Sequence, residues 1–290
     1  MPSPSEVLTP ALLRDWPLPS TGSDKHSRGN VLVVGGAAST PGAALLAGVA
    51  SLRVGAGRLK LAVAESTAVA VAVAVPEAGV TGLAQDQNGT VLGAGAERLR
   101  SSIGGIDVLL VGPGLDDAEQ TAQLLAAVVR MLGADVPVVL DAYALGVLPG
   151  LKDVQAALAG RVALTPNASE AARLLDEEEV EDFASAVPEI AKRFDAVVSC
   201  QGVIAAPDGR RWTASSGYGG LATSGSGDVL AGAVAGLVAR GAGLDQATCW
   251  GTHLHAAGGD RLAARVGPLG YLARELVEQL PLAMMELSAR

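Results

Sequence analysis

The segment Gly225-Ser226-Gly227-Asp228 joins a flexible glycine turn to a carboxylate, and the Ala, Val and Leu residues that follow predict a buried helix. The first N–H groups of a helix lack partners within it and carry partial positive charge, so glycines there let a phosphate come close. Asp228 would repel phosphate, but it could take a proton from a hydroxyl that attacks a phosphoryl group. The alternative is that Asp228 only caps a core helix and the glycines only ease a turn.

The composition indicates one α/β domain. The 290 residues allow one large domain or two small ones, and we favour one. With 49% hydrophobic but only 3% aromatic residues, the core must consist of Ala, Val, Leu and Gly, which favours a mostly parallel sheet with helices on both faces. Cys200 and Cys249 are far apart in apolar surroundings, so we expect two small core residues and neither a disulfide nor a zinc site.

Charge and hydropathy restrict the partners. The net charge of −9 argues against a nucleic-acid partner or an anionic membrane surface, so an anionic ligand would need a local site. The N-terminus lacks the basic start and apolar run of a signal peptide. The longest apolar stretch, residues 67–75, has about half of the ~20 residues that span a bilayer. We therefore expect a cytoplasmic protein with no membrane partner.

Strands and helices are predicted to alternate along the chain. The proline-rich residues 1–24 are expected to form an irregular lead-in with a short helix at 5–13, and residues 25–290 a single domain. Apolar runs predict strands at 31–34, 58–64, 107–111, 137–140, 161–164 and 196–199, and a hairpin of 203–206 with 211–214. Helices are expected at 42–54, 119–132, 169–175, 184–194, 229–240, 244–265 (interrupted) and 269–286, with a short helix or extended segment at 68–75.

The predicted strands end in glycine or polar loops, at Gly35, Gly112, Asp141 and Thr165. In an open parallel sheet the carboxyl ends of the strands lie on one edge, where ligands usually bind, so these loops should converge on one crevice. Asp141 is a candidate acid on the metal or phosphate side, or simply the cap of the next helix.

Two further patterns have alternative interpretations. Thr165-Pro166-Asn167 with Glu170 could place polar groups over the crevice, or it could form a capping box. His253 and His255 are two residues apart in a helical region, so they face different sides and predict packing, not a metal pair. The glycines at 35–42 do not have the G-x-G-x-x-G spacing of a dinucleotide fold, and a G-x-S-x-G hydrolase elbow is missing from the sequence.

Taken in order, these motifs resemble those of the ribokinase-like fold and, more narrowly, of the ADP/ATP-dependent NAD(P)H-hydrate dehydratases, which repair hydrated nicotinamide cofactors. The resemblance covers roughly residues 24–285 and is most specific at Ala222–Gly232, which matches A-T-G-G-T-G-D-V-L-A-G. Gly112-Pro113-Gly114-Leu115 matches the family's G-P-G-L, and Thr165-Pro166 with Glu170 matches T-P-H-P-G-E. Related vitamin-precursor kinases usually carry Cys at the position of Asp228, so Asp228 favours the dehydratases over these kinases.

The resemblance implies a role for each matching position. Asp228 would be the catalytic base, and the N–H groups of Gly225, Ser226 and Gly227 would stabilise the transferring phosphoryl group. Hydrated NADH or NADPH would bind near Ala43, Gly112, Gly114, Asn167 and Asp228. ADP or ATP, with Mg²⁺ bridging its phosphates, would lie over Cys200, Gln201, Gly202, Val203, Ile204 and Gly227. The sequence identifies no protein ligands for the metal.

The resemblance also implies an assembly. Family members form tetramers, and the apolar helix at 269–286 could supply such a surface or ordinary core, through Leu280, Leu282, Met284 and Met285. A separate epimerase for the hydrated cofactors is a further expected partner.

The chain departs from the family pattern at several positions. Asn167 replaces a His, Tyr143 replaces a second acid after Asp141, and Ser199-Cys200-Gln201 lacks the family's Lys. The family's G-N-P-G is Gly217-Tyr218-Gly219-Gly220 here. Two alternatives therefore stand beside the repair enzyme: a small-molecule kinase of the same fold, and a nucleotide-binding or regulatory protein that no longer turns over.

Overall fold

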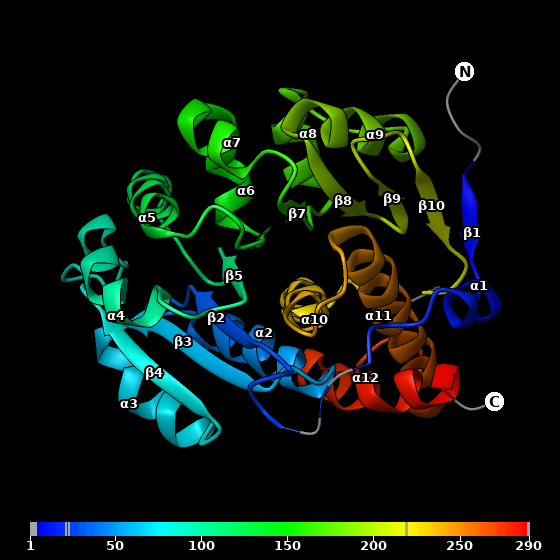
Figure 1. Ribbon diagram of the computed structural model, residues 1–290, viewed down its shortest axis with the longest axis horizontal. Coiled ribbons are helices and arrows are strands. Elements are labelled where there is room, and N and C mark those ends of the chain that lie inside the picture. The colour runs from blue at the N-terminus through cyan, green and yellow to red at the C-terminus, as the bar shows by residue number, and fades with distance from the viewer. Residues whose placement is uncertain (1–4, 21, 23, 218–219, 289–290) are drawn as a thin grey trace.

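The computed structural model describes residues 5–20, 22, 24–217 and 220–288; Tyr218 and Gly219 of the departing glycine motif lie outside these residues. The strands form one ten-stranded sheet of order β1-β10-β9-β8-β7-β6-β5-β2-β3-β4 (Figure 1). Their bounds are β1 (Glu6–Leu8), β2 (Asn30–Val34), β3 (Arg58–Ala64), β4 (Ala78–Leu83), β5 (Val108–Val111), β6 (Val138–Leu140), β7 (Val162–Leu164), β8 (Ala196–Cys200), β9 (Val203–Ala205) and β10 (Arg211–Ala214). Neighbouring strands are parallel except where β9 pairs with β8 and β10, which confirms the predicted hairpin.

Helices cover both faces of the sheet, because alternate residues of each strand point to opposite sides. In β2, Val31 and Val33 belong to one buried cluster, whereas Leu32 and Val34 belong to the other. The first cluster includes α1 (Pro10–Asp15), α2 (Pro41–Arg53), α3 (Glu65–Ala74), α10 (Ser226–Ala239), α11 (Leu244–Val266) and α12 (Ala273–Ser288). The second includes η1 (Gly93–Leu99), α4 (Arg100–Ile103), α5 (Ala118–Met131), α6 (Tyr143–Val147), η2 (Leu148–Gly150), α7 (Lys152–Leu158), α8 (Ala168–Leu175) and α9 (Phe183–Phe194). This arrangement confirms the predicted fold class.

The helix that carries the glycine turn, α10, is buried almost all round and lies directly against α2. A Cβ on Gly232 would overlap the carbonyl oxygen of Ala47, and one on Gly236 would overlap that of Ser51. These two glycines therefore let the helix backbones approach closely, which fixes α10 against the sheet.

Helix α11 runs without a break from Leu244 to Val266, so the predicted interruption is wrong. Glycine has a low helix propensity, but tertiary packing outweighs it here. Side chains of other elements occupy the space beside the glycines: Val234 lies against Gly251, Leu276 against Gly258, and Leu221 against Gly259.

The N-terminal segment is more regular than expected: a short helix forms, but it lies later than the predicted 5–13, because residues 6–8 form a strand. Strand β1 pairs in parallel with β10, and α1 begins only at Pro10, where the Thr9 hydroxyl caps it by accepting from the Leu12 N–H (3.1 Å). Trp16 then stacks on Trp212 at 6.0 Å between ring centroids, and its carbonyl accepts a hydrogen bond from Trp250 Nε1 (3.0 Å). The segment is thus held along the edge of the sheet.

Other elements differ less from expectation. Residues 65–74 are a helix, and α12 begins at Ala273, four residues after the predicted start. Cys200 and Cys249 are buried free thiols, as predicted. In the described part of the chain, every helix is too short or too polar to cross a membrane.

Candidate active site

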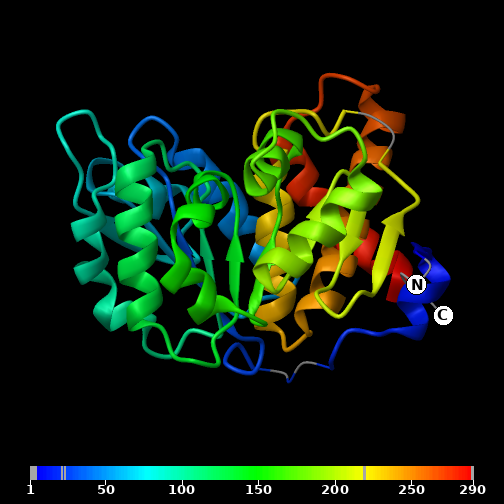
Figure 2. The same ribbon diagram turned by 90° about the horizontal axis from the view of Figure 1, so that it is seen from above.

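The first part of the site forms where the strand order reverses. Strands β2, β3 and β4 follow one another outward, and β5 then returns to the other side of β2. Open parallel sheets bind ligands at such a switch point, beyond the carboxyl ends of the strands, which point upward in Figure 2. The loops after β2 and β5 are joined there, because the Gly36 N–H donates to the Pro113 carbonyl (2.8 Å) and the Ala37 N–H to the Gly114 carbonyl (2.7 Å).

Two predicted substrate-side residues meet at this junction. A Cβ on Gly114 would lie 3.0 Å from the Ala43 Cβ, and the φ of Gly114 is +72°, a conformation that favours glycine. Gly112, with φ +127°, lies so close to the next strand end that a Cβ there would overlap the carbonyl oxygen of Asp141. Ala43, Gly112 and Gly114 are therefore brought together beside Asp141.

Asp141 directly follows the end of β6 and is only 4% exposed. Its carboxylate accepts a hydrogen bond from the Thr165 hydroxyl (2.9 Å), which joins the ends of β6 and β7. The following helix α6 begins after Ala142 and has no side-chain cap in the described residues. The interpretation of Asp141 as a simple helix cap is therefore wrong. Tyr143, which replaces the family's second acid, starts α6 and is 43% exposed.

The loop after β7 adds polar groups at the same edge. Asn167 caps α8 by accepting from the Glu170 N–H (2.9 Å), and the Glu170 carboxylate accepts from the Asn167 N–H (2.9 Å). This is the predicted capping box. Asn167 is exposed, so its side chain can cap the helix and still face solvent at the crevice.

The glycine turn before α10 has the form of an anion-binding loop. Gly225 is the N-cap with φ +86°, and a side-chain cap is lacking in the described residues, so Asp228 lies in the first turn and does not cap. The Ser226 N–H already donates to the Thr223 carbonyl (3.1 Å). Within the described chain the N–H groups of Gly225 and Gly227 have no acceptor, and a Cβ on Gly227 would meet nothing within 4 Å. These two N–H groups are open to a phosphate.

Three carboxylates influence one another across the crevice. Burial, together with the negative charge of Glu170, raises the pKa of Asp228 to about 6. Burial also raises the pKa of Glu170, and it raises that of Asp141 well above its ordinary value, with the charges of Asp228 and Glu170 adding to the effect. Asp228 is therefore a carboxylate whose pKa suits a general base near neutral pH.

The described residues contain no cluster of three His, Cys, Asp or Glu side chains arranged to hold a metal ion. Asp141, Glu170 and Asp228 nevertheless bring three carboxyl groups close enough for the charges of Glu170 and Asp228 to raise the pKa of Asp141. This donor set fits a cation that arrives with a ligand, and it does not fit a resident metal centre.

The predicted nucleotide-side residues lie at the end of β8. Gln201 (φ +49°) and Gly202 (φ +77°) form the two-residue turn to β9, as hairpin turns with positive φ require. The Cys200 and Ile204 side chains are buried, so only backbone groups of these two residues could contact a ligand. Burial raises the pKa of the Cys200 thiol to about 12, and the nearby charge of Glu170 contributes.

His255 is a site residue that sequence reasoning missed. Its Nε2 lies 2.9 Å from the Ser226 hydroxyl oxygen and 3.0 Å from the Ser226 carbonyl oxygen. Burial lowers the pKa of His255 to about 4, so the ring is neutral at physiological pH. The sequence carried no signal for this contact, because it depends on how α11 packs against α10.

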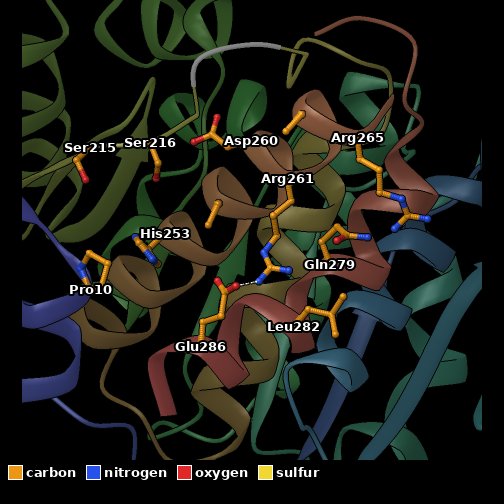
Figure 3. Close-up of a pocket in the computed structure, with 12 residues that line it drawn as sticks. Pro10, Ser215, Ser216, His253, Asp260, Arg261, Arg265, Gln279, Leu282 and Glu286 are labelled. Carbon is orange, nitrogen blue, oxygen red and sulfur yellow. Dashed lines mark ion pairs between the residues drawn. The ribbon is translucent and has the colours of Figure 1, made fainter. Parts of the chain in front are cut away.

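His253 lies on the other side of α11, in a cavity of about 650 Å³ between the end of β10, α11 and α12 (Figure 3). The ion pair of Arg261 with Glu286 spans this cavity. None of the predicted site residues lines it. The cavity is therefore separate from the crevice where the chemistry converges.

The fold is ribokinase-like. A ribokinase-like superfamily protein from Enterococcus faecalis superposes with a TM-score of 0.83 over 98% of this chain and 96% of that one, at 22% identity. An ADP/ATP-dependent NAD(P)H-hydrate dehydratase from Bacillus subtilis, co-crystallized with ATP/Mg²⁺, gives a TM-score of 0.80 at 27% identity over 98% of this chain and 99% of that one.

The chain belongs to the NAD(P)H-hydrate dehydratase family, whose sequence model matches residues 31–282. It is 43% identical over 284 residues to an ADP-dependent (S)-NAD(P)H-hydrate dehydratase from Xanthomonas campestris, covering 95% of this chain and 94% of that protein. It is 34% identical to a bifunctional NAD(P)H-hydrate repair enzyme from Thermofilum pendens, but it spans only 53% of that longer protein.

Proposed function

We propose that this protein uses ADP or ATP to dehydrate hydrated NADH and NADPH. The observation that carries the proposal is a carboxylate with a pKa near 6, Asp228, in the first turn of a helix whose Gly225 and Gly227 N–H groups are open. The name of the Xanthomonas relative, an ADP-dependent dehydratase of 43% identity, supports the choice of substrate.

In the proposed reaction, Asp228 takes the proton of the hydrate's hydroxyl as its oxygen attacks the terminal phosphoryl group of the nucleotide. The N–H groups of Gly225 and Gly227 stabilise the charge on the transferring group. The phosphate ester then eliminates phosphate: the ring C–O bond breaks, a proton leaves the adjacent ring carbon, and the dihydronicotinamide double bond is restored.

The convergence of the strand-end loops supports a placement for each ligand. The hydrated nicotinamide would lie near Ala43, Gly112, Gly114 and Asn167, and the nucleotide near the turn from Cys200 to Ile204. Mg²⁺, with which the Bacillus relative was co-crystallized, would arrive on the nucleotide's phosphates and reduce their repulsion from Asp141, Glu170 and Asp228.

Incubation with hydrated NADH and either nucleotide tests the reaction. Return of the NADH absorbance without a stable phosphorylated product is the expected result. Accumulation of a phosphate ester of an alcohol substrate would favour the small-molecule kinase. Nucleotide binding by calorimetry without turnover of any hydrate would favour the regulatory protein that the substitutions at Tyr143, Asn167 and Cys200 left open.

The pKa of Asp228 predicts the pH dependence of this reaction. Because the base must be deprotonated, kcat/KM for hydrated NADH should rise as the pH increases through about 6 and then level off. Glu170→Gln removes a negative charge that raises the pKa of Asp228, so the acid limb of the profile should move to lower pH. Gln also preserves the capping box of α8.

The matched control for this shift is Glu177→Gln, because Glu177 is exposed just beyond the end of α8. Its profile should coincide with that of the wild type. An acid limb that stays in place in the Glu170 variant would contradict the assignment of Asp228 as the titrating base.

We also infer that four copies of this protein assemble. A separate protein would supply the epimerase activity. Exposed apolar side chains on two helices support an interface: Val69 and Val73 on α3, and Leu282 and Met285 on α12. Leu280, in contrast, is part of the core.

A further inference from the structure

Helix α11 supplies the side-chain hydrogen-bond partner of Ser226, the middle residue of the anion-binding loop. The His255 Nε2 reaches both the hydroxyl and the carbonyl oxygen of Ser226, at 2.9 and 3.0 Å. His255 and Ser226 are 8% and 3% exposed, so water does not compete for these bonds. Either tautomer restrains the loop: a protonated Nε2 donates to the carbonyl, and an unprotonated one accepts from the hydroxyl.

The loop needs such a restraint because glycines flank Ser226. Gly225 and Gly227 are conformationally permissive, and a side-chain cap at the start of α10 is absent among the described residues. The directions of the Gly225 and Gly227 N–H groups therefore depend on how Ser226 is held, by the bond from its N–H to the Thr223 carbonyl (3.1 Å) and by His255. A small rotation of this peptide segment would turn the open N–H groups away from a phosphoryl group.

The same face of α11 also holds the nucleotide side of the crevice. Thr252, one turn before His255, forms a hydrogen bond of 2.8 Å between its hydroxyl and that of Ser199 in β8. Both hydroxyl groups are buried. Helix α11 thus contacts the anion-binding loop through His255 and the strand leading to the Gln201-Gly202 turn through Thr252.

We propose that His255 is a positioning residue that orients the Gly225 and Gly227 N–H groups toward the phosphates of the nucleotide, an inference that rests on the proposed function. It does not touch the reacting atoms. It acts through Ser226, and α11 keeps the loop in register with the strand that ends at Cys200.

His253 provides a matched control on the same helix. It is a buried histidine two residues away, but it faces the cavity of Figure 3, and within the described chain its Nδ1 has no hydrogen-bond partner. His253→Leu and His255→Leu therefore make the same chemical change on opposite sides of α11. Melting temperatures of both variants show whether each one folds.

The test compares ADP affinity by calorimetry with the steady-state kinetics of hydrate turnover. His255→Leu should weaken ADP binding about tenfold and lower kcat at least about tenfold, with KM for hydrated NADH unchanged. His255→Gln, whose amide nitrogen can reach the Ser226 carbonyl, should recover both values to within about threefold. His253→Leu should match the wild type.

Two results would overturn the proposal: ADP binding and kcat at wild-type levels in a folded His255→Leu variant, or equal losses in His253→Leu. A wild-type protein that binds ADP but turns over no hydrate would contradict the proposed function alone. In that case the ADP titrations of the variants still decide the role of His255.

Discussion

Asp228→Asn is expected to lower kcat for hydrate turnover by at least ~100-fold, the loss typical of removing a general base. The amide has nearly the same shape but cannot accept the hydroxyl proton at neutral pH. The fold and the affinity for ADP should remain, because the open N–H groups of Gly225 and Gly227 belong to the backbone. Steady-state kinetics and calorimetry measure the two effects separately.

The same substitution should raise the melting temperature at pH 7 to 8. The pKa of Asp228 rises from an ordinary 3.8 in the unfolded chain to about 6 in the folded one, so the folded state holds the proton more tightly. The resulting cost to stability is present above about pH 6 and disappears below about pH 4, and Asn removes it. A variant with near wild-type turnover, or with a lower melting temperature at pH 8, would contradict this account of Asp228.

Gly112→Ala is expected to destabilise the protein by about 3 kcal/mol, which lowers the melting temperature by roughly 6 °C in a chain of this size. The φ of +127° disfavours any residue with a Cβ, and this Cβ would overlap the carbonyl oxygen of Asp141, which belongs to the backbone and cannot rotate away. The displaced strand ends should also raise KM for the hydrate.

Gly146→Ala is the matched control for this prediction. Gly146 lies in α6, just beyond Asp141, and a Cβ there would meet nothing within 4 Å. Alanine should therefore leave the stability unchanged or increase it by up to about 1 kcal/mol through its higher helix propensity. Thermal unfolding that shows the same midpoint for both variants would mean that the ends of β5 and β6 are not in close contact.

The central strands could be predicted from the sequence because apolar runs such as Val31–Val34 end at glycine or polar residues. Strand β4 was missed because it is an edge strand: Gly79 and Gly82 interrupt its sequence, and most of its residues are only half-buried. The interruption expected in α11 does not occur, because side chains that are distant in sequence fill the space beside its glycines.

The convergence of the strand-end loops could be predicted from the sequence, because the carboxyl ends of parallel strands lie on one edge of the sheet. The raised pKa of Asp228 could not be predicted from the sequence, because it depends on burial and on the charge of Glu170, which lies in another helix. The sequence also suggested three N–H groups for the phosphate. One of them, that of Ser226, donates instead to the Thr223 carbonyl, in a turn that the sequence pattern does not reveal.

All three tryptophans of the chain lie side by side. Trp16 stacks on Trp212, and its carbonyl accepts a hydrogen bond from Trp250. The tryptophan fluorescence of this protein therefore originates at one place, where the N-terminal segment meets β10 and α11. None of the three indole rings belongs to the loops of the crevice. An emission change during unfolding reports the release of that segment, whereas ligand binding has to be followed by another signal, such as a label attached at the crevice.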